Sequence, residues 1–288
     1  MKRRDFLPAL ASTALVAAQG QSTARIARKG RLKQSCFGRN FGSGMPLEAM
    51  CREAARLGVV GFDGVPLEQW PTLKKFGLIP TLARGGGVTI ENGIIQQRLQ
   101  NELVKSQEAF IDKCAAEGCP NILIVGGQRN GMPYAQAADH AVEFLNLVKS
   151  RAEEKRVTLC LEVMNSKYQD PDLGRKDQVC DRLDWALDVC TRVNSPRVKI
   201  LFDIYHVQIT DGDIVDNIRA HFPLIGHFHT GGVPGRHEID DTQELNYGFI
   251  FRTIADLGFA GYVAHEYDPT PGGDPVRILE RVFRITDV

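Results

Sequence analysis

Short apolar runs alternate with longer amphipathic segments along most of this chain. The runs are rich in β-branched, leucine and aromatic residues, which predicts buried strands. Between them apolar residues recur at helical spacing, as Met50, Ala54 and Leu57 do before Gly58 ends the segment. The expected strands cover residues 32–41, 59–65, 78–86, 121–127, 157–163, 198–206, 224–230 and 261–267. The expected helices cover residues 46–58, 66–77, 91–120, 132–156, 177–194, 213–222, 246–258 and 275–283.

Eight strand-and-helix units in succession predict an α/β protein with a single closed (β/α)₈ TIM barrel, which typically needs about 250 residues. A doubly wound open sheet also alternates strands and helices, but its first strand usually leads into a Gly-x-Gly-x-x-Gly turn. Residues 37–46 contain several glycines without that spacing. We therefore assign residues 32–288 to one barrel domain.

The first residues differ in kind from the barrel. Arg3 and Arg4 precede an apolar segment from Phe6 to Ala18 that ends in small residues. This pattern is typical of a twin-arginine signal peptide over residues 1–18, followed by a polar linker over residues 19–31. The apolar segment is too short to span a bilayer comfortably, so we expect no membrane span in the mature protein and export to the periplasm.

Charge and cysteine content narrow the choice of partners. Lys plus Arg and Asp plus Glu both number 35, so no overall field favours nucleic acid. The seven cysteines are odd in number and form neither a zinc-ribbon pattern nor a redox pair. We expect them to be buried free thiols.

Four consecutive predicted strands end in residues that can ligate metals. Alternation of side chains along a strand turns one such residue from each strand toward the same side. The set, in strand order, is Glu162, Asp203, His229 and Glu266. One buried carboxylate at a strand end is usually capped or salt-bridged, but four in phase favour a metal site. Carboxylates with one imidazole suit Mn²⁺, Mg²⁺ or Co²⁺, so we expect one divalent ion as cofactor.

A metal held by two glutamates suits one kind of chemistry. The ion can bind a carbonyl and a neighbouring hydroxyl, polarise the carbonyl and stabilise the enediolate formed when a proton leaves the adjacent carbon. One glutamate then has to act as the base, and the other can return the proton. Around them, Arg39, Asn40 and Arg84 end other predicted strands and either contact substrate or cap the strands.

The fold and this set resemble the xylose isomerase-like barrel superfamily. GVPGRHE (232–238), DTQELNYGFIF (241–251) and GYVAHEY (261–267) resemble the hydroxypyruvate isomerase family, whereas GHFHTG (226–231) resembles the ketose 3-epimerases. The resemblance implies that the four residues above are metal ligands and that Glu162 and Glu266 are also the acid/base pair. It implies that His206 and Arg236 contact substrate. Hydroxypyruvate isomerases are expected to have a glutamine where this chain has His229, so at this position the chain departs from them toward the epimerases.

The expected function is a metal-dependent isomerase or epimerase of a small sugar, keto-sugar or hydroxy-keto acid. Two alternatives share much of this sequence evidence. One is a dehydratase of a keto-sugar or inosose, which begins with the same enolisation. The other is an exported carbohydrate-binding barrel without turnover. The resemblance also implies a homo-oligomer.

Overall fold

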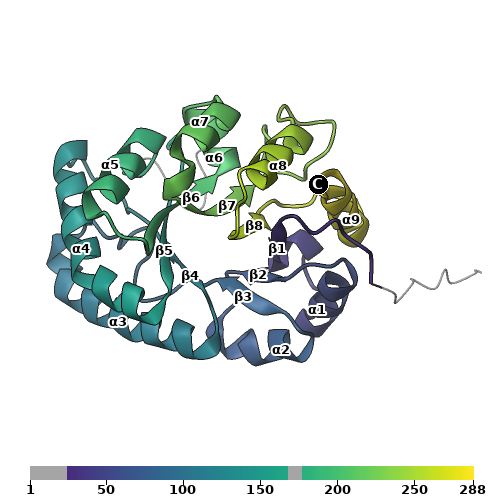
Figure 1. The fold of residues 1–288 in the computed structure, drawn as a ribbon, viewed down its shortest axis with the longest axis horizontal. Coiled ribbons are helices and arrows are strands. Elements are labelled where there is room, and N and C mark those ends of the chain that lie inside the picture. The colour runs from purple at the N-terminus through teal and green to yellow at the C-terminus, as the bar shows by residue number, and fades with distance from the viewer. Residues whose placement is uncertain (1–24, 168–176) are drawn as a thin grey trace, which may run out of the picture.

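Eight parallel strands form the inner ring of the structure, and the helices lie outside them (Figure 1). The structure is a computed structural model that describes residues 25–167 and 177–288. The strands pair in the order β3-β2-β1-β8-β7-β6-β5-β4. Their bounds are β1 Lys33–Phe37, β2 Gly61–Asp63, β3 Ile79–Leu82, β4 Asn121–Ile124, β5 Thr158–Glu162, β6 Val198–Asp203, β7 Ile225–Thr230 and β8 Tyr262–His265. The predicted TIM barrel is confirmed.

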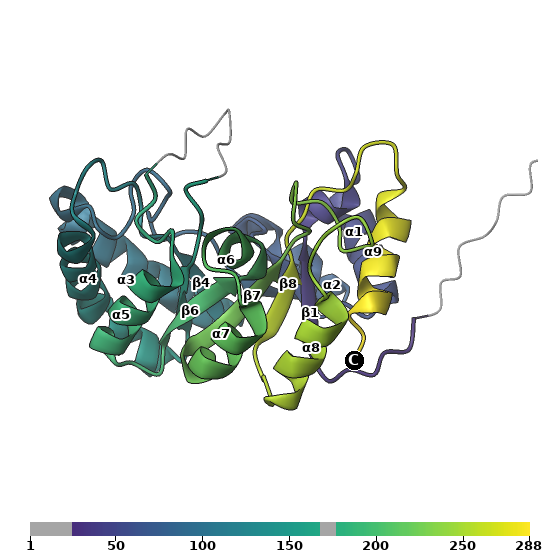
Figure 2. The same ribbon diagram turned by 90° about the horizontal axis from the view of Figure 1, so that it is seen from above.

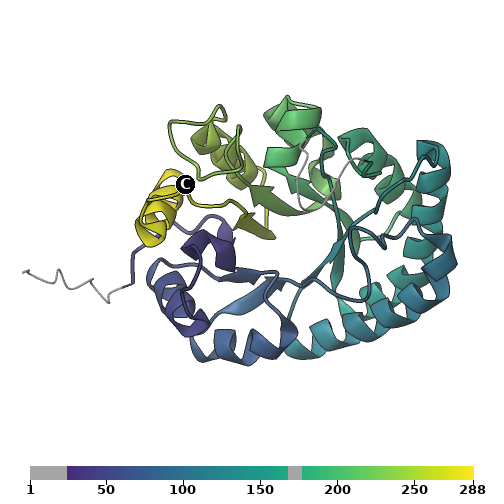
Figure 3. The same ribbon diagram turned by 180° about the vertical axis from the view of Figure 1, so that it is seen from behind.

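Helices surround this ring, as the view from behind shows (Figure 3). Each presents an apolar face to the sheet, which encloses the main hydrophobic core between the two layers. Their bounds are α1 Leu47–Arg56, α2 Trp70–Lys75, α3 Gln100–Glu117, α4 Tyr134–Lys155, α5 Leu183–Val193, α6 Ile204–Thr210, α7 Ile214–His221, α8 Tyr247–Asp256 and α9 Pro275–Ile285. Short 3₁₀ helices cover Gly38–Phe41, Leu67–Gln69, Gln97–Leu99 and Phe222–Leu224.

The ring closes between β3 and β4 through a narrower joint than the other strand pairs have. Ala83 and Ile122 form an isolated parallel bridge there. The Ala83 amide donates to the Asn121 carbonyl at 2.9 Å, and the Leu123 amide donates to the Ala83 carbonyl at 2.9 Å. The Asn121 side-chain amide adds a bond to the Thr81 carbonyl at 2.8 Å. Backbone and side-chain bonds together therefore complete the barrel.

The barrel interior holds apolar and polar side chains next to each other. Leu82, Cys160 and Leu201 form a small cluster inside the ring, separate from the main core. Asp63 is the register partner of Leu82, and His227 is the register partner of Leu201. Asp63 and His227 are buried and hydrogen-bonded to each other, as buried polar groups need to be because water cannot reach them.

The loops after β1 and after β8 rise on the same side of the ring (Figure 2). Residues 25–31 and the C-terminus lie on the opposite side, where the Lys29 amide donates to Asp287 at 2.9 Å. In barrels of this kind the carboxyl ends of the strands carry the functional residues. The predicted site residues all follow or end strands on that side.

Several predicted segments were wrong at their boundaries, among them the strands predicted over 32–41 and 78–86, which end at Phe37 and Leu82. Three others show the physical reason. The strand predicted over 198–206 ends at Asp203, because the Asp203 carboxylate accepts the Tyr205 amide at 2.9 Å and begins α6. The helix predicted over 91–120 begins late, because Ile94 and Ile95 donate backbone bonds to residues 125 and 126. The helix predicted over 177–194 also begins late, because residues 177–179 bond to the backbone of residues 127–129.

Two further expectations concern the cysteines and the N-terminus. All seven cysteines are buried and free, as predicted. No helix in the described ranges is long and apolar enough to cross a membrane. The predicted signal peptide (1–18) and residues 19–24 of the linker lie outside the described residues, so export and a periplasmic location stay predictions.

Gly61 tests the packing of β2 against β3. A Cβ atom at this position would lie 2.0 Å from the Ile79 carbonyl oxygen, which is backbone. We expect Gly61→Ala to cost about 3 kcal/mol and to lower Tm by roughly 5–10 °C, measured by circular dichroism. Gly248→Ala is the matched control, because its nearest neighbour would be the Arg252 side chain at 3.5 Å. Equal Tm values for Gly61→Ala and the parent would contradict this packing.

Candidate metal centre

Four ligand-type side chains converge where β5 to β8 end. Glu162 is the last residue of β5, Asp203 ends β6, His229 lies in β7 and Glu266 directly follows β8. All four are buried, and one ligand atom from each lies within 4.8 Å of those of the other three. The predicted alternation along these strands therefore brings the predicted set together.

His229 is the centre of this arrangement. Its Nδ1 lies 2.7 Å from Glu266 Oε2 and 3.3 Å from Glu162 Oε1. Although the ring is buried, Nδ1 has no hydrogen bond within the described residues. The other ring nitrogen, Nε2, bonds to Asp63 Oδ2 at 3.1 Å. One imidazole nitrogen thus faces two carboxylates without a hydrogen bond of its own.

Asp203 has a separate use for each carboxylate oxygen. Oδ1 accepts backbone amides of Tyr205 and His206 at 2.9 and 3.4 Å and so caps α6. Oδ2 faces the site, 3.2 Å from Arg236 Nη2 and 3.5 Å from His206 Nε2. Burial of this carboxyl raises the pKa of Asp203 to about 7, although Arg236 opposes the shift.

Arg236 reaches the site from the loop after β7. Its guanidinium lies 2.9 Å from Glu266 Oε2 and stands over the ring of Tyr205. The residue has a left-handed backbone (φ 57°), which is uncommon for a residue other than glycine. Two backbone bonds hold it: the Arg236 amide donates to Gly232, and the Asp268 amide donates to Arg236. A constrained loop therefore holds the positive charge of Arg236 at the site.

Two more arginines approach Glu266 from the opposite side. Arg39 pairs with Glu266 Oε1, and Arg84 Nη2 lies 3.4 Å from the same oxygen. Both guanidiniums stand over the ring of Phe37, at 5.2 and 5.4 Å from its centroid. Arg39 is one-third exposed and Arg84 half exposed, so both border the open side of the site.

Glu266 is ionised by this surrounding charge. Burial alone raises a carboxyl pKa, but Arg236 and His229 outweigh it and hold the pKa of Glu266 well below its usual value. Burial likewise opposes the charged form of His229, yet Glu266 and Asp63 raise its pKa well above the usual value. The pair therefore carries opposite charges in close contact.

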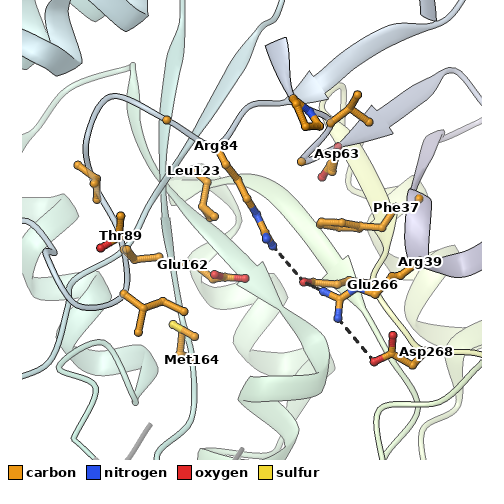
Figure 4. Close-up of a pocket in the computed structure, with 18 of the residues that line it drawn as sticks. Phe37, Arg39, Asp63, Arg84, Thr89, Leu123, Glu162, Met164, Glu266 and Asp268 are labelled. Carbon is orange, nitrogen blue, oxygen red and sulfur yellow. Dashed lines mark hydrogen bonds and ion pairs between the residues drawn. The ribbon is translucent and has the colours of Figure 1, made fainter. Parts of the chain in front are cut away.

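A cavity of about 1090 Å³ opens above these residues. Figure 4 shows Arg84 extending toward Glu266, with Arg39 nearby. Glu162 appears on the other side of the view, near the apolar side chains of Leu123 and Met164. His206 and Arg236, which the resemblance implied to be substrate contacts, also line the cavity. Its volume is slightly above the usual range for small-molecule sites.

The donor set fits a divalent cation. Three carboxylates and one imidazole nitrogen already lie in one shell, and His229 Nδ1 is a buried nitrogen without a hydrogen bond. Oxygen-rich sites with one imidazole suit Mg²⁺, Mn²⁺ or Co²⁺. Asp63 bonds to the other ring nitrogen of His229. Metal-ligating histidines commonly have a carboxylate partner of this kind.

Sequence reasoning missed Asp63 altogether. This residue ends β2, is 1% exposed, and bonds both His227 and His229. The missed signal is an aspartate inside an apolar run, GFDGV, which ends its strand as Glu162 and Asp203 end theirs. His227 lies two residues before His229, on the same face of β7, and bonds to Asp63 at 2.7 Å.

With this geometry established, comparison with known proteins defines the class. Residues 72–283 match the family model described as xylose isomerase-like TIM barrel. The chain belongs to this family.

Among curated relatives, a human protein named putative hydroxypyruvate isomerase is 33% identical over 178 residues, covering 60% of this chain and 61% of that protein. A 2-oxo-tetronate isomerase from Cupriavidus necator is 32% identical over 131 residues, covering 46% and 48%. The matched regions thus span about half the length of these relatives.

A solved structure extends the fold comparison over more of the chain. The crystal structure titled AP endonuclease, family 2, from Brucella melitensis superposes with a TM-score of 0.75 at 22% identity. The match covers 86% of this chain and 96% of that one. At this identity the likeness concerns the fold alone.

Mn²⁺ binding by a variant at Asp203 tests the proposed set of metal ligands. We expect metal-stripped protein to bind Mn²⁺ in calorimetry, and Mn²⁺ at 100 times its Kd to add about 2.7 kcal/mol of folding stability. Asp203→Asn keeps the cap acceptor of α6 but removes a charged ligand, so it should weaken Mn²⁺ binding strongly. Asp268→Asn, an exposed rim carboxylate, is the control. Unchanged Mn²⁺ affinity in Asp203→Asn would exclude Asp203 from the site.

Proposed function

We propose that this protein is a divalent-metal-dependent isomerase or epimerase that acts on a small hydroxy-keto compound through an enediolate. The observation that carries the proposal is the placement of Glu162 and Glu266. The two glutamates lie on either side of His229 Nδ1, at 3.3 and 2.7 Å, at the inner end of the cavity. Two carboxylates beside one reacting carbon are what a proton abstraction and return require.

The two glutamates have different surroundings, which suits different tasks. Glu266 is surrounded by Arg236, Arg39 and Arg84, whereas Glu162 has no arginine among its ion pairs within the described residues. Guanidiniums stabilise a carboxylate and make it a weaker base. We therefore assign proton abstraction to Glu162, which then carries the proton that is returned to the substrate, and we assign Glu266 to the opposite face of the substrate.

The ion supplies Lewis acidity that polarises the substrate carbonyl when it is bound. The protein's own residues do the rest. Glu162, Asp203, His229 and Glu266 would hold the ion, and His206 borders the cavity next to Asp203. Arg236 is held in place by its loop and faces the charge that develops on substrate oxygens.

The arginines favour an acidic substrate. Arg39 and Arg84 share Oε1 of Glu266, whereas Oε2 faces His229. Both guanidiniums are partly exposed at the open side of the cavity, and each has further N–H donors for an anionic group of the substrate. Guanidinium groups bind carboxylates through paired charge-assisted hydrogen bonds. A hydroxy-keto acid therefore fits better than a neutral ketose.

The names of the relatives agree with this choice. The human and Cupriavidus proteins are named for hydroxypyruvate and 2-oxo-tetronate, both of which carry a carboxylate. The GHFHTG segment around His229 resembles ketose 3-epimerases, and for this reason the proposal includes epimerisation as well as isomerisation. The reaction type is open to a direct test.

Proton exchange is the direct test of the two glutamates. Metal-loaded protein in D₂O with hydroxypyruvate, 2-oxo-tetronate, ketoses and aldoses should incorporate deuterium, read by NMR. We expect Glu162→Gln and Glu266→Gln each to lower incorporation by roughly 10²–10⁴-fold. Mn²⁺ occupancy of each variant is measured in parallel, because both residues are also proposed ligands.

The same experiment separates the alternatives. Deuterium at a carbon beside the carbonyl with a changed carbonyl position indicates an isomerase, and inversion without that change indicates an epimerase. A product lighter by one water would indicate the dehydratase. Tight carbohydrate binding without any exchange would indicate the binding barrel. Wild-type exchange in both glutamine variants would contradict the mechanism.

Removal of an arginine tests the charge of the substrate. We expect Arg39→Gln or Arg84→Gln to raise KM for the hydroxy-keto acid about tenfold, because a charge-assisted contact contributes about 1.5–3 kcal/mol. KM for a neutral ketose should change little. Arg277→Gln is the control, since Arg277 is exposed at the start of α9 and pairs with Asp274. Equal effects on acid and ketose would argue against an anion contact.

A further inference from the structure

Asp63 receives hydrogen bonds from four side chains inside the barrel. Its Oδ2 accepts His227 Nε2 at 2.7 Å and His229 Nε2 at 3.1 Å. Its Oδ1 accepts the hydroxyl of Thr81 and, at 3.4 Å, that of Ser35. Donors from β1, β3 and β7 thus meet on a single carboxylate of β2.

These four hydrogen bonds make Asp63 unsuited to act as a catalytic base. Each of its oxygens already accepts two protein donors, and the residue is 1% exposed. A carboxylate satisfied in this way is poorly placed to take a proton from a substrate. Its contacts instead act on the imidazole rings beside it.

The effect on His229 is specific. An acceptor at Nε2 keeps a proton on that nitrogen, so Nδ1, which faces Glu162 and Glu266, is the nitrogen that can give up its proton and ligate an ion. The ring cannot easily turn away, because the rings of Phe37 and His227 pack edge-on against it, each with centroids 5.2 Å distant. Asp63 therefore sets both the tautomer and the direction of the proposed metal ligand.

We propose that Asp63 is a positioning residue of the metal centre, which holds His229 Nδ1 ready for the ion. The inference rests on the proposed metal site and adds a residue outside the ligand set. His227 shares the same oxygen and keeps Asp63 centred below His229. Partners of this kind typically change metal affinity by 10–100-fold when they are removed.

A different role for the same residues is a second ion site. Ligand atoms of Asp63, His227 and His229 also lie within 4.8 Å of one another. Both imidazole Nε2 atoms, however, already bond to one oxygen of Asp63, and an ion would have to replace those bonds. The stoichiometry of binding distinguishes the two roles.

Metal binding is the test, so turnover of a substrate is not needed. We expect Asp63→Asn to bind one Mn²⁺ with a Kd about 10–100-fold higher than that of the parent, by isothermal titration of metal-stripped protein. Thr81→Val is the matched control, because it removes a donor to the other oxygen of Asp63 and leaves the histidine bonds. Its Mn²⁺ affinity should equal that of the parent.

Three results would overturn the proposal: parent-like affinity in Asp63→Asn, equal weakening in Thr81→Val, or two ions per chain. If the parent chain binds no divalent ion at all, the proposed function fails with it. If the parent binds one ion and Asp63→Asn binds it equally well, only the role of Asp63 fails.

A measurement on the unmodified chain covers the case in which Asp63→Asn does not fold. Protein with nitrogen-15 histidine is loaded with cadmium-113, a spin-active divalent probe. We expect the cadmium coupling on Nδ1 of His229 and the proton on Nε2, with a hydrogen-bonded proton shift. Coupling to Nε2 would overturn the proposal, since Asp63 could not then hold that nitrogen.

Discussion

Burial of charged carboxylates is the constraint on which this site depends. An isolated ionised carboxylate inside a protein is very costly, and removal of one partner from a buried pair typically destabilises by about 3–5 kcal/mol. Asp63 is met by two histidines and two hydroxyls, Asp203 by the amides of α6 and by Arg236, and Glu266 by arginines on both sides. Each of these carboxylates is thereby held in one orientation.

Strands and loops divide this task. The strands place the acids and His229, whereas the main balancing charge, Arg236, comes from a loop. That loop is fastened to the one after β8, because Glu238 accepts the Thr270 amide and hydroxyl at 2.9 and 3.0 Å. The His237 ring adds a bond to the Asp268 carbonyl at 2.9 Å. The GRHE segment thus directs one side chain inward and uses the next two as anchors.

The repeating pattern of apolar runs was enough to predict the barrel and the four convergent residues. Period-two alternation carries that information, since it places Glu162, Asp203 and His229 on the inner face whatever the loops do. The pattern could not show that Asp203 also ends its strand, because capping depends on the backbone of α6. Arg39 and Arg84 were found as candidates but not as a pair, because only the fold places both over Phe37.

Asp63 escaped prediction for a related reason. Its two histidine partners are more than 160 residues away in the chain, and the local GFDGV pattern does not indicate them. The late starts of α3 and α5 have the same origin, since bonds to residues after β4 outweigh helical propensity. Contacts between distant segments decided each of these features.

The narrow joint between β3 and β4 lies apart from the proposed metal ligands. The shape of the substrate cavity and the spacing of the ligands can therefore change independently during evolution. The proposed ligands follow β5 to β8, which are paired with one another along their length. Leu123, beside the joint, lines the apolar wall of the cavity. Substitutions around the joint can therefore reshape the substrate space while the reacting groups keep their spacing. A barrel built in this way can acquire new substrates without having to rebuild its chemistry.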